Sequence, residues 1–153
     1  MTIVGMGNPE MGDDGIGVHL AEMLSEQARR GDWRVPAEIV CADRDPLLAG
    51  ALLAEGKRVL LIDAVDMKRE PGAWRIFTDA DLPPCREPAG GSTHTLPLAQ
   101  VVELARGLGC ADRLRIMGIQ VGDVRPGRFL SAPVRRCVPD VVTRIREEAE
   151  ALP

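Results

Sequence analysis

Four side chains in this sequence have the chemistry of a hydrolytic or metal-binding site. They are the neighbouring carboxylates Asp13 and Asp14, the carboxylate Asp63 and the imidazole of His94. Two carboxylates and one imidazole would give a divalent metal such as nickel or zinc three protein ligands and leave positions open for water or substrate. The same groups could also exchange protons as general acids and bases. Because these residues are far apart in the sequence, only the fold can bring them together.

Each of these residues also has a purely structural interpretation. Asp13 and Asp14 precede a helical pattern, where a carboxylate commonly accepts bonds from free backbone N–H groups and caps the helix. His94 lies in a Gly-Gly-Ser-Thr-His-Thr segment and could be an exposed loop histidine. Asp63 is the strongest functional candidate, because an acid at the end of an apolar run must be desolvated unless it meets a partner or faces a cleft. His19 falls inside the helical pattern and is expected on the helix surface.

The apolar and glycine-rich segments predict the elements that must hold these residues. Short apolar runs bounded by glycine and proline predict strands at residues 3–6, 37–42, 58–64, 72–77 and 114–121. Helical spacing predicts helices at residues 16–28, 46–55, 95–107 and 131–151, the last one kinked at Pro139. Residues 82–91, rich in proline and glycine, are expected to form a loop. The alternation predicts one three-layer α/β/α domain over residues 1–153, with a mostly parallel, twisted sheet of about five strands.

This fold class predicts where the candidate residues meet. In such folds the binding crevice lies beyond the carboxyl ends of the strands. The loop after the first strand carries Asp13 and Asp14, Asp63 is near the end of the central strand, and His94 precedes the third helix. All four are therefore expected at one edge of the sheet.

Composition and motif spacing argue against several classes of function. The net charge is −4 and the nineteen Lys and Arg residues are scattered, which does not suit binding to a nucleic acid backbone. The first glycine-bearing loop, Gly5 to Glu10, lacks the third glycine of a dinucleotide-binding fingerprint, and the sequence contains no P-loop. It also contains no G-x-S-x-G elbow and no cysteine with an obvious histidine partner. Ordinary serine or cysteine protease chemistry is therefore unsupported.

The cysteines and the N-terminal residues indicate in which cellular compartment the protein works. Cys41, Cys85, Cys110 and Cys137 form no C-x-x-C pair and are expected to be buried free thiols. The first residues carry no basic signal region, and no apolar stretch is long enough for a membrane span. We expect a cytoplasmic protein.

Several separated motifs together resemble the hydrogenase maturation protease family. Their order and spacing match across nearly the whole chain: Gly5-Met6-Gly7-Asn8, Gly12-Asp13-Asp14-Gly15-Ile16-Gly17, Ile62-Asp63-Ala64, Thr93-His94 and Gly118-Ile119-Gln120. Residues 11–15, 63–67 and 93–98 are similar to the branch that processes the large subunit of formate-hydrogenlyase-type hydrogenases.

The resemblance implies an endopeptidase that removes the C-terminal extension of a nickel-loaded nickel-iron hydrogenase large-subunit precursor. By motif, Asp14 and not Asp13 is the first acid, and it joins Asp63 and His94 as the catalytic and nickel-binding residues. Nickel would be supplied by the precursor, so no tightly held metal is expected in the isolated enzyme. The precursor is the expected partner of a monomeric chain, and neither a nucleic acid nor a membrane is expected as one.

The resemblance also assigns supporting residues and exposes one departure. Asn8 and the loop glycines would shape the turn that presents Asp14, and Gln120 would line the cleft. After its second strand the family commonly has an Asp-Gly-Gly-like segment, whereas this chain has Asp43-Arg44-Asp45. Charged residues here would change how the substrate fits.

Two other functions remain open on the sequence. A non-catalytic chaperone that binds nickel or hydrogenase is favoured by the altered segment at residues 43–45. A peptidyl-tRNA hydrolase also opens with a strand and a Gly-x-Gly-Asn-Pro turn. Such an enzyme would need a Thr-Arg-His-Asn-type segment where this chain has Gly12-Asp13-Asp14-Gly15.

Overall fold

The computed structural model describes residues 1–82 and 96–151. Within them a five-stranded sheet has the spatial order β2-β1-β3-β5-β4. Its strands are β1 (Thr2–Met6), β2 (Glu38–Asp43), β3 (Val59–Val65), β4 (Trp74–Phe77) and β5 (Leu114–Gln120). Strands β2, β1, β3 and β5 are parallel, and β4 is antiparallel to β5 at the edge. The mostly parallel sheet of the sequence prediction is confirmed.

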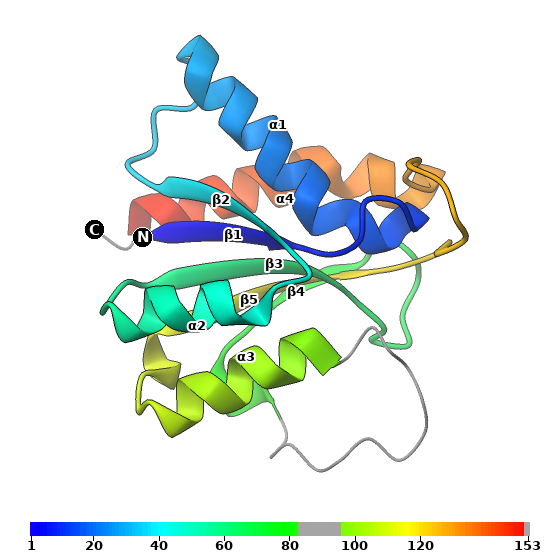
Figure 1. Cartoon of the computed structure of the whole chain (residues 1–153). Coiled ribbons are helices and arrows are strands. Elements are labelled where there is room, and N and C mark those ends of the chain that lie inside the picture. The colour runs from blue at the N-terminus through cyan, green and yellow to red at the C-terminus, as the bar shows by residue number, and fades with distance from the viewer. Residues whose placement is uncertain (83–95, 152–153) are drawn as a thin grey trace.

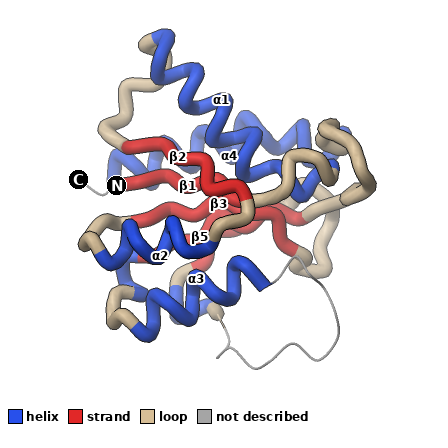
Figure 2. The backbone as a smooth tube through the Cα atoms, viewed as in Figure 1, coloured by secondary structure: helices blue, strands red, loops and turns tan. Residues whose placement is uncertain are grey.

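Four helices of the described residues cover the two faces of this sheet (Figure 1 and Figure 2). Helices α1 (Ile16–Arg30) and α4 (Ala132–Ala151) lie on one face, and α2 (Pro46–Ala54) and α3 (Leu96–Gly107) lie on the other. Short 3-10 turns occur at η1 (Gly12–Gly15), η2 (Asp79–Asp81) and η3 (Ala111–Arg113). The predicted three-layer α/β/α arrangement is confirmed.

Alternate residues of the central strand β3 supply two separate apolar cores. Leu60 and Ile62 pack on the side of α1 and α4, whereas Leu61 packs on the side of α2 and α3. This alternation follows from the two-residue period of a strand. Burial on both faces explains the continuously apolar sequence of β3. Asp63 follows on the same strand and shares the face of Leu61.

The boundaries of the elements differ from the predicted ones by small amounts. Strand β4 begins at Trp74, two residues later than predicted, because Gly72 adopts a left-handed φ of 85° and ends a turn there. Helix α4 begins at Ala132 and continues through Pro139 to Ala151. The predicted helix start at Thr95 and most of the predicted loop at residues 82–91 lie outside the described residues.

The predicted burial of the cysteines is confirmed in part. Cys110 and Cys137 are buried free thiols, but Cys41 is exposed, and Cys85 lies outside the described residues. The prediction was wrong for Cys41 because β2 is an edge strand whose residues are mostly exposed or half-buried. None of the helices in the described part has the length and apolar content that a membrane span requires.

Candidate active site at the carboxyl edge of the sheet

The carboxyl ends of β1, β3 and β5 meet at one edge of the sheet, because these strands are parallel and adjacent. The loop that carries Asp14 follows β1, and its η1 turn contacts β3. Asp63 lies near the end of β3, and Gln120 ends β5 in register with Val65. Asp14 and Asp63 therefore come together at the edge that the fold class predicted.

Asp63 is a buried carboxylate, only 5% exposed. Its Oδ1 accepts a hydrogen bond from the backbone N–H of Ala64 at 2.9 Å. Burial raises the pKa of Asp63 from 3.8 to about 7; the Ala64 bond acts in the opposite direction, and the negative charge of Asp14 raises the pKa further. Asp63 can therefore exchange a proton near neutral pH, and its charge interacts with that of Asp14.

Asp14 lies in the η1 turn and is 8% exposed. The backbone N–H of Asn8 donates to both Oδ2 and the main-chain oxygen of Asp14, at 3.2 Å in each case. The Oδ1 of Asn8 in turn accepts the backbone N–H of Glu10 at 3.1 Å. Gly7 has a φ of 132°, and a Cβ there would lie 1.9 Å from the main-chain oxygen of Asp14. Asn8 and Gly7 thus make the turn contacts that the family resemblance implied.

Asp13 points away from this pair and anchors a distant loop. Its side chain is fully buried. Oδ2 accepts the backbone N–H groups of Gly122 and Asp123 at 2.8 Å each and the hydroxyl of Ser131 at 2.7 Å. Oδ1 accepts the backbone N–H of Ser131 at 2.6 Å. All four donors belong to the segment between β5 and α4, so Asp13 has a structural role that Asp14 does not share.

The helix-capping interpretation of Asp13 and Asp14 is wrong. The N-cap residue of α1 is Gly15, and no side chain caps this helix. The η1 turn stands between the two aspartates and α1, so their carboxylates are directed to other partners. Asp13 bonds the loop before α4, and Asp14 bonds Asn8 beside Asp63.

Gln120 holds the loop that follows β3. Its Oε1 accepts the backbone N–H groups of Met67 at 2.6 Å and Arg69 at 3.2 Å. Its Nε2 donates to Oδ1 of Asp66 at 3.3 Å. Gln120 therefore lies at the carboxyl edge, as the prediction of a cleft residue requires, but its amide group is used in fixing the loop beside Asp63.

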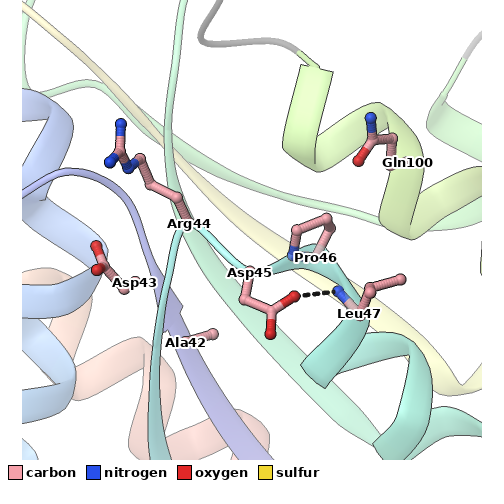
Figure 3. Close-up of a pocket in the computed structure, with 7 residues that line it drawn as sticks. All are labelled: Ala42, Asp43, Arg44, Asp45, Pro46, Leu47 and Gln100. Atoms are coloured by element: carbon pink, nitrogen blue, oxygen red, sulfur yellow. Dashed lines mark hydrogen bonds between the residues drawn. The ribbon is translucent and has the colours of Figure 1, made fainter.

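A pocket of about 540 Å³ opens between the loop after β2 and helix α3 (Figure 3). It is lined by the segment from Ala42 to Leu47 and by Gln100. The segment includes Asp43, Arg44 and Asp45, the charged residues that depart from the family pattern. Their position confirms that the departure lies on a pocket wall and not on a remote surface.

The wall of this pocket is joined to the loop that carries Asp14. Asp43 adopts a left-handed φ of 50°, and its carbonyl oxygen accepts the backbone N–H of Gly7 at 2.8 Å. Asp45 caps α2 by accepting the backbone N–H of Leu47 at 2.9 Å. One wall of the pocket is therefore bonded to the loop that carries Asp14, at the carboxyl edge of the sheet.

The third predicted site residue, His94, lies outside the described residues. Within residues 1–82 and 96–151, no three His, Cys, Asp or Glu side chains are grouped so that they could hold a metal ion. Asp14 and Asp63 would supply two of the three predicted ligands. They suit a cation, because burial and mutual repulsion disfavour the charged form of Asp63 and a nearby positive charge would offset both effects.

Comparison with known proteins agrees with the motif pattern. The family HycI, hydrogenase maturation protease, matches residues 18–148. The Hydrogenase 3 maturation protease of Escherichia coli K12 is 31% identical over 141 residues, which cover 92% of this chain and 85% of that protein. The hydrogenase expression/formation protein HupD of Rhizobium leguminosarum bv. viciae is 27% identical over 144 residues, covering 93% of this chain and 70% of HupD.

Solved structures of this kind have the same fold. The crystal structure of the nickel-iron hydrogenase maturation protease HycI from Thermococcus kodakarensis KOD1 has a TM-score of 0.73 and 25% identity, covering 97% of this chain and 91% of HycI. A crystal structure of Hydrogenase 3 maturation protease has a TM-score of 0.70 and 27% identity, with 95% and 88% of the two chains covered.

Proposed function

The chain belongs to the hydrogenase maturation protease family, and we therefore propose that it removes the C-terminal extension of a nickel-loaded nickel-iron hydrogenase large-subunit precursor. The observation that carries this proposal is the meeting of Asp14 and Asp63, 49 positions apart in the sequence, at the carboxyl edge of the sheet. The identity to the Hydrogenase 3 maturation protease supports a substrate of the formate-hydrogenlyase type.

In this proposal nickel is part of the substrate. Asp14, Asp63 and His94 bind the precursor's nickel, which places the adjacent peptide bond at the edge of the sheet and lowers the entropy cost of attack. Nickel or a carboxylate would activate the attacking water, whose proton would pass to a carboxylate of the site. Without nickel, burial and the charge of Asp14 raise the pKa of Asp63 to about 7, and a bound cation would lower it. Because aspartate carboxylates carry out the chemistry in this proposal, the enzyme would be an aspartic-type endopeptidase.

The pocket at residues 42–47, whose wall is bonded to the loop of Asp14, would receive part of the precursor. The charged segment from Asp43 to Asp45 lines it, so the shape and charge of this wall influence which precursor fits. We propose that the protein acts in the cytoplasm as a monomer, with the precursor as its partner.

The test is to incubate the purified protein with nickel-loaded and nickel-free large-subunit precursor from the same organism and to record intact masses. We expect loss of a C-terminal peptide from the loaded form only. Binding without cleavage would favour the non-catalytic chaperone. Release of peptide from peptidyl-tRNA, measured in parallel, would favour the hydrolase that shares the opening turn.

Variants locate the activity. Asp63→Ala and His94→Ala should each abolish processing while the far-ultraviolet circular dichroism stays unchanged. Asp112→Ala is the matched control, because this aspartate is exposed on η3, at the opposite end of β5. Normal processing by both site variants would contradict the assignment of these residues.

A further inference from the structure

A second hollow of about 300 Å³ lies on the other face of the sheet, between α1 and α4. We call it the α1–α4 groove. Leu20 and Met23 of α1 line it, as do Val138 of α4 and Leu130 of the loop before α4. Met23, Leu130 and Val138 are only partly buried, so the groove leaves apolar surface open to water. Such surface favours contact with another apolar group.

Two polar groups interrupt the apolar lining of the groove. His19 was expected on the helix surface, but it is half-buried here, and its Nε2 has no hydrogen-bond partner among the described residues. Arg135 is exposed at the rim, and no carboxylate within residues 1–82 and 96–151 forms an ion pair with it. A partner that offers an apolar side chain to the groove and a carboxylate to its rim would cover the apolar lining and pair with Arg135.

An exposed aromatic ring stands next to the groove. Phe129 is 85% exposed, although the chain contains only two phenylalanines. It precedes Leu130, which lines the groove. Large aromatic side chains that are left exposed on an ordered segment are typical anchors of protein interfaces.

The segment that presents Phe129 is firmly attached to the loop of Asp14. Asp13 binds both of its ends through Gly122 and Ser131. In its middle, Gly127 accepts the backbone N–H of Gly12 at 2.7 Å and donates to the carbonyl of Glu10 at 2.8 Å. Figure 1 shows the two loops side by side at the same end of the molecule. A surface held in this way loses little conformational entropy on binding.

One end of the groove reaches the loop that carries Asp14, because the Nε2 of His19, which lines the groove, is 3.2 Å from the position that a Cβ on Gly15 would take. Ile16 lines the groove and is only two residues beyond Asp14. A partner bound to Phe129 and the groove would therefore have another part of its chain close to the acids. This is the arrangement that a protease needs when its substrate is a large folded protein.

We propose that Phe129, the α1–α4 groove and Arg135 form the docking surface for the hydrogenase precursor, which inserts an apolar side chain and pairs a carboxylate with Arg135. The proposal rests on the proposed function, since it names the contact by which the same substrate is held. Docking here is separate from the chemistry at Asp14 and Asp63.

The test compares the precursor concentration dependence of processing for Phe129→Ala and Arg135→Glu with that of the unaltered protein. Each change should raise KM for the nickel-loaded precursor about tenfold or more, with the loss falling on KM and not on kcat. Leu108→Ala is the control for Phe129, because Leu108 is 48% exposed just beyond the end of α3. Arg136→Glu is the control for Arg135, because it has the same charge change and Arg136 does not line the groove.

The outcomes separate this proposal from the proposed function. If the unaltered protein cleaves the precursor and both variants keep its KM, the docking surface is wrong and the function stands. If the unaltered protein neither binds nor cleaves the precursor, both the docking surface and the proposed function are wrong. If sedimentation shows a dimer that Phe129→Ala dissociates, the surface binds a second copy of the chain and the proposal is overturned. Thermal unfolding checks that each variant is folded.

Discussion

Adjacent aspartates in this protein have separate roles because their side chains meet different groups. Asp13 is surrounded by four hydrogen-bond donors of one loop. Asp14 lies near Asp63, whose charged form is disfavoured by burial and by the charge of Asp14. Asp13 therefore contributes to the stability of the fold, and Asp14 contributes negative charge beside Asp63.

The raised pKa of Asp63 predicts a pH-dependent loss of stability. In the unfolded chain this pKa is 3.8, and in the folded protein it is about 7, so the folded state binds more protons between these values. The free energy of unfolding should therefore fall as the pH rises through this window. Asp63→Asn cannot ionise, and its amide oxygen can still accept the Ala64 N–H. We expect it to be more stable than the unaltered protein at pH 8, by up to about 4 kcal/mol.

Urea unfolding at pH 5 and pH 8 measures this effect. The difference in unfolding free energy between the two pH values should be smaller for Asp63→Asn than for the unaltered protein. Equal differences would mean that Asp63 ionises normally in the fold. The variant should also fail to process the precursor, so it would gain stability and lose activity.

The four hydrogen bonds of Asp13 predict that a small change in its side chain will greatly lower the free energy of unfolding. Asp13→Asn keeps the shape of the side chain but turns an amide N–H group toward a backbone donor of Ser131 or toward the donors at Oδ2. We expect a loss of about 3 kcal/mol or more in the free energy of unfolding. Ser131→Ala removes only the hydroxyl donor and should cost about 1 kcal/mol. Urea unfolding at pH 7 compares the two, and similar losses would contradict the anchoring role of Asp13.

At the scale of elements, the site depends on how closely α1 approaches the sheet. A Cβ on Gly17 would lie 2.2 Å from the carbonyl oxygens of Met6 and Ile62, which belong to β1 and β3. These are backbone atoms of central strands and cannot move aside without disturbing the sheet. The absence of a side chain at Gly17 therefore sets the position of the first turn of α1, directly after the η1 turn that carries Asp14.

Gly17→Ala should destabilise the protein by about 3 kcal/mol or more, because the added methyl group forces α1 away from both strands. It should also reduce processing at temperatures where the variant is still folded, since Asp14 moves with the helix. Gly107→Ala is the control. No atom lies within 4 Å of its would-be Cβ at the end of α3, so this change should stabilise the helix by up to about 1 kcal/mol. Thermal unfolding of both variants decides the comparison.

At the scale of the whole molecule, α4 connects the two ends of the sheet. Its first turn follows Ser131, which Asp13 holds near the carboxyl edge. Near its other end Glu148 is 4% exposed and forms ion pairs with Arg115 of β5 and Arg144 of α4. Since Arg115 is close to the amino end of β5, this pair is remote from the candidate site.

Glu148→Gln should therefore lower the stability of the molecule without altering the site. We expect a loss of about 2 kcal/mol, smaller than for a fully buried pair because both arginines are partly exposed. Glu147→Gln, on the preceding residue, removes only an exposed pair with Arg144 and should change stability by less than about 0.5 kcal/mol. Denaturant unfolding measures both losses, and an equal KM for the precursor would place Glu148 outside the site.

The alternation of apolar runs with helical spacing was enough to predict the three-layer fold. It also predicted the buried central strand, because a strand that is covered on both faces has apolar residues at successive positions. With the rule for carboxyl ends, it also placed Asp14 and Asp63 at one edge. His94 stays a prediction, since it lies outside the described residues.

Three features depend on the tertiary structure alone. They are the different roles of Asp13 and Asp14, the raised pKa of Asp63 and the α1–α4 groove. The donors to Asp13 come from residues 109 to 118 positions away, and no local pattern encodes such a contact. Periodicity reports which face of an element is buried, whereas the partner of a buried charge depends on how distant loops pack.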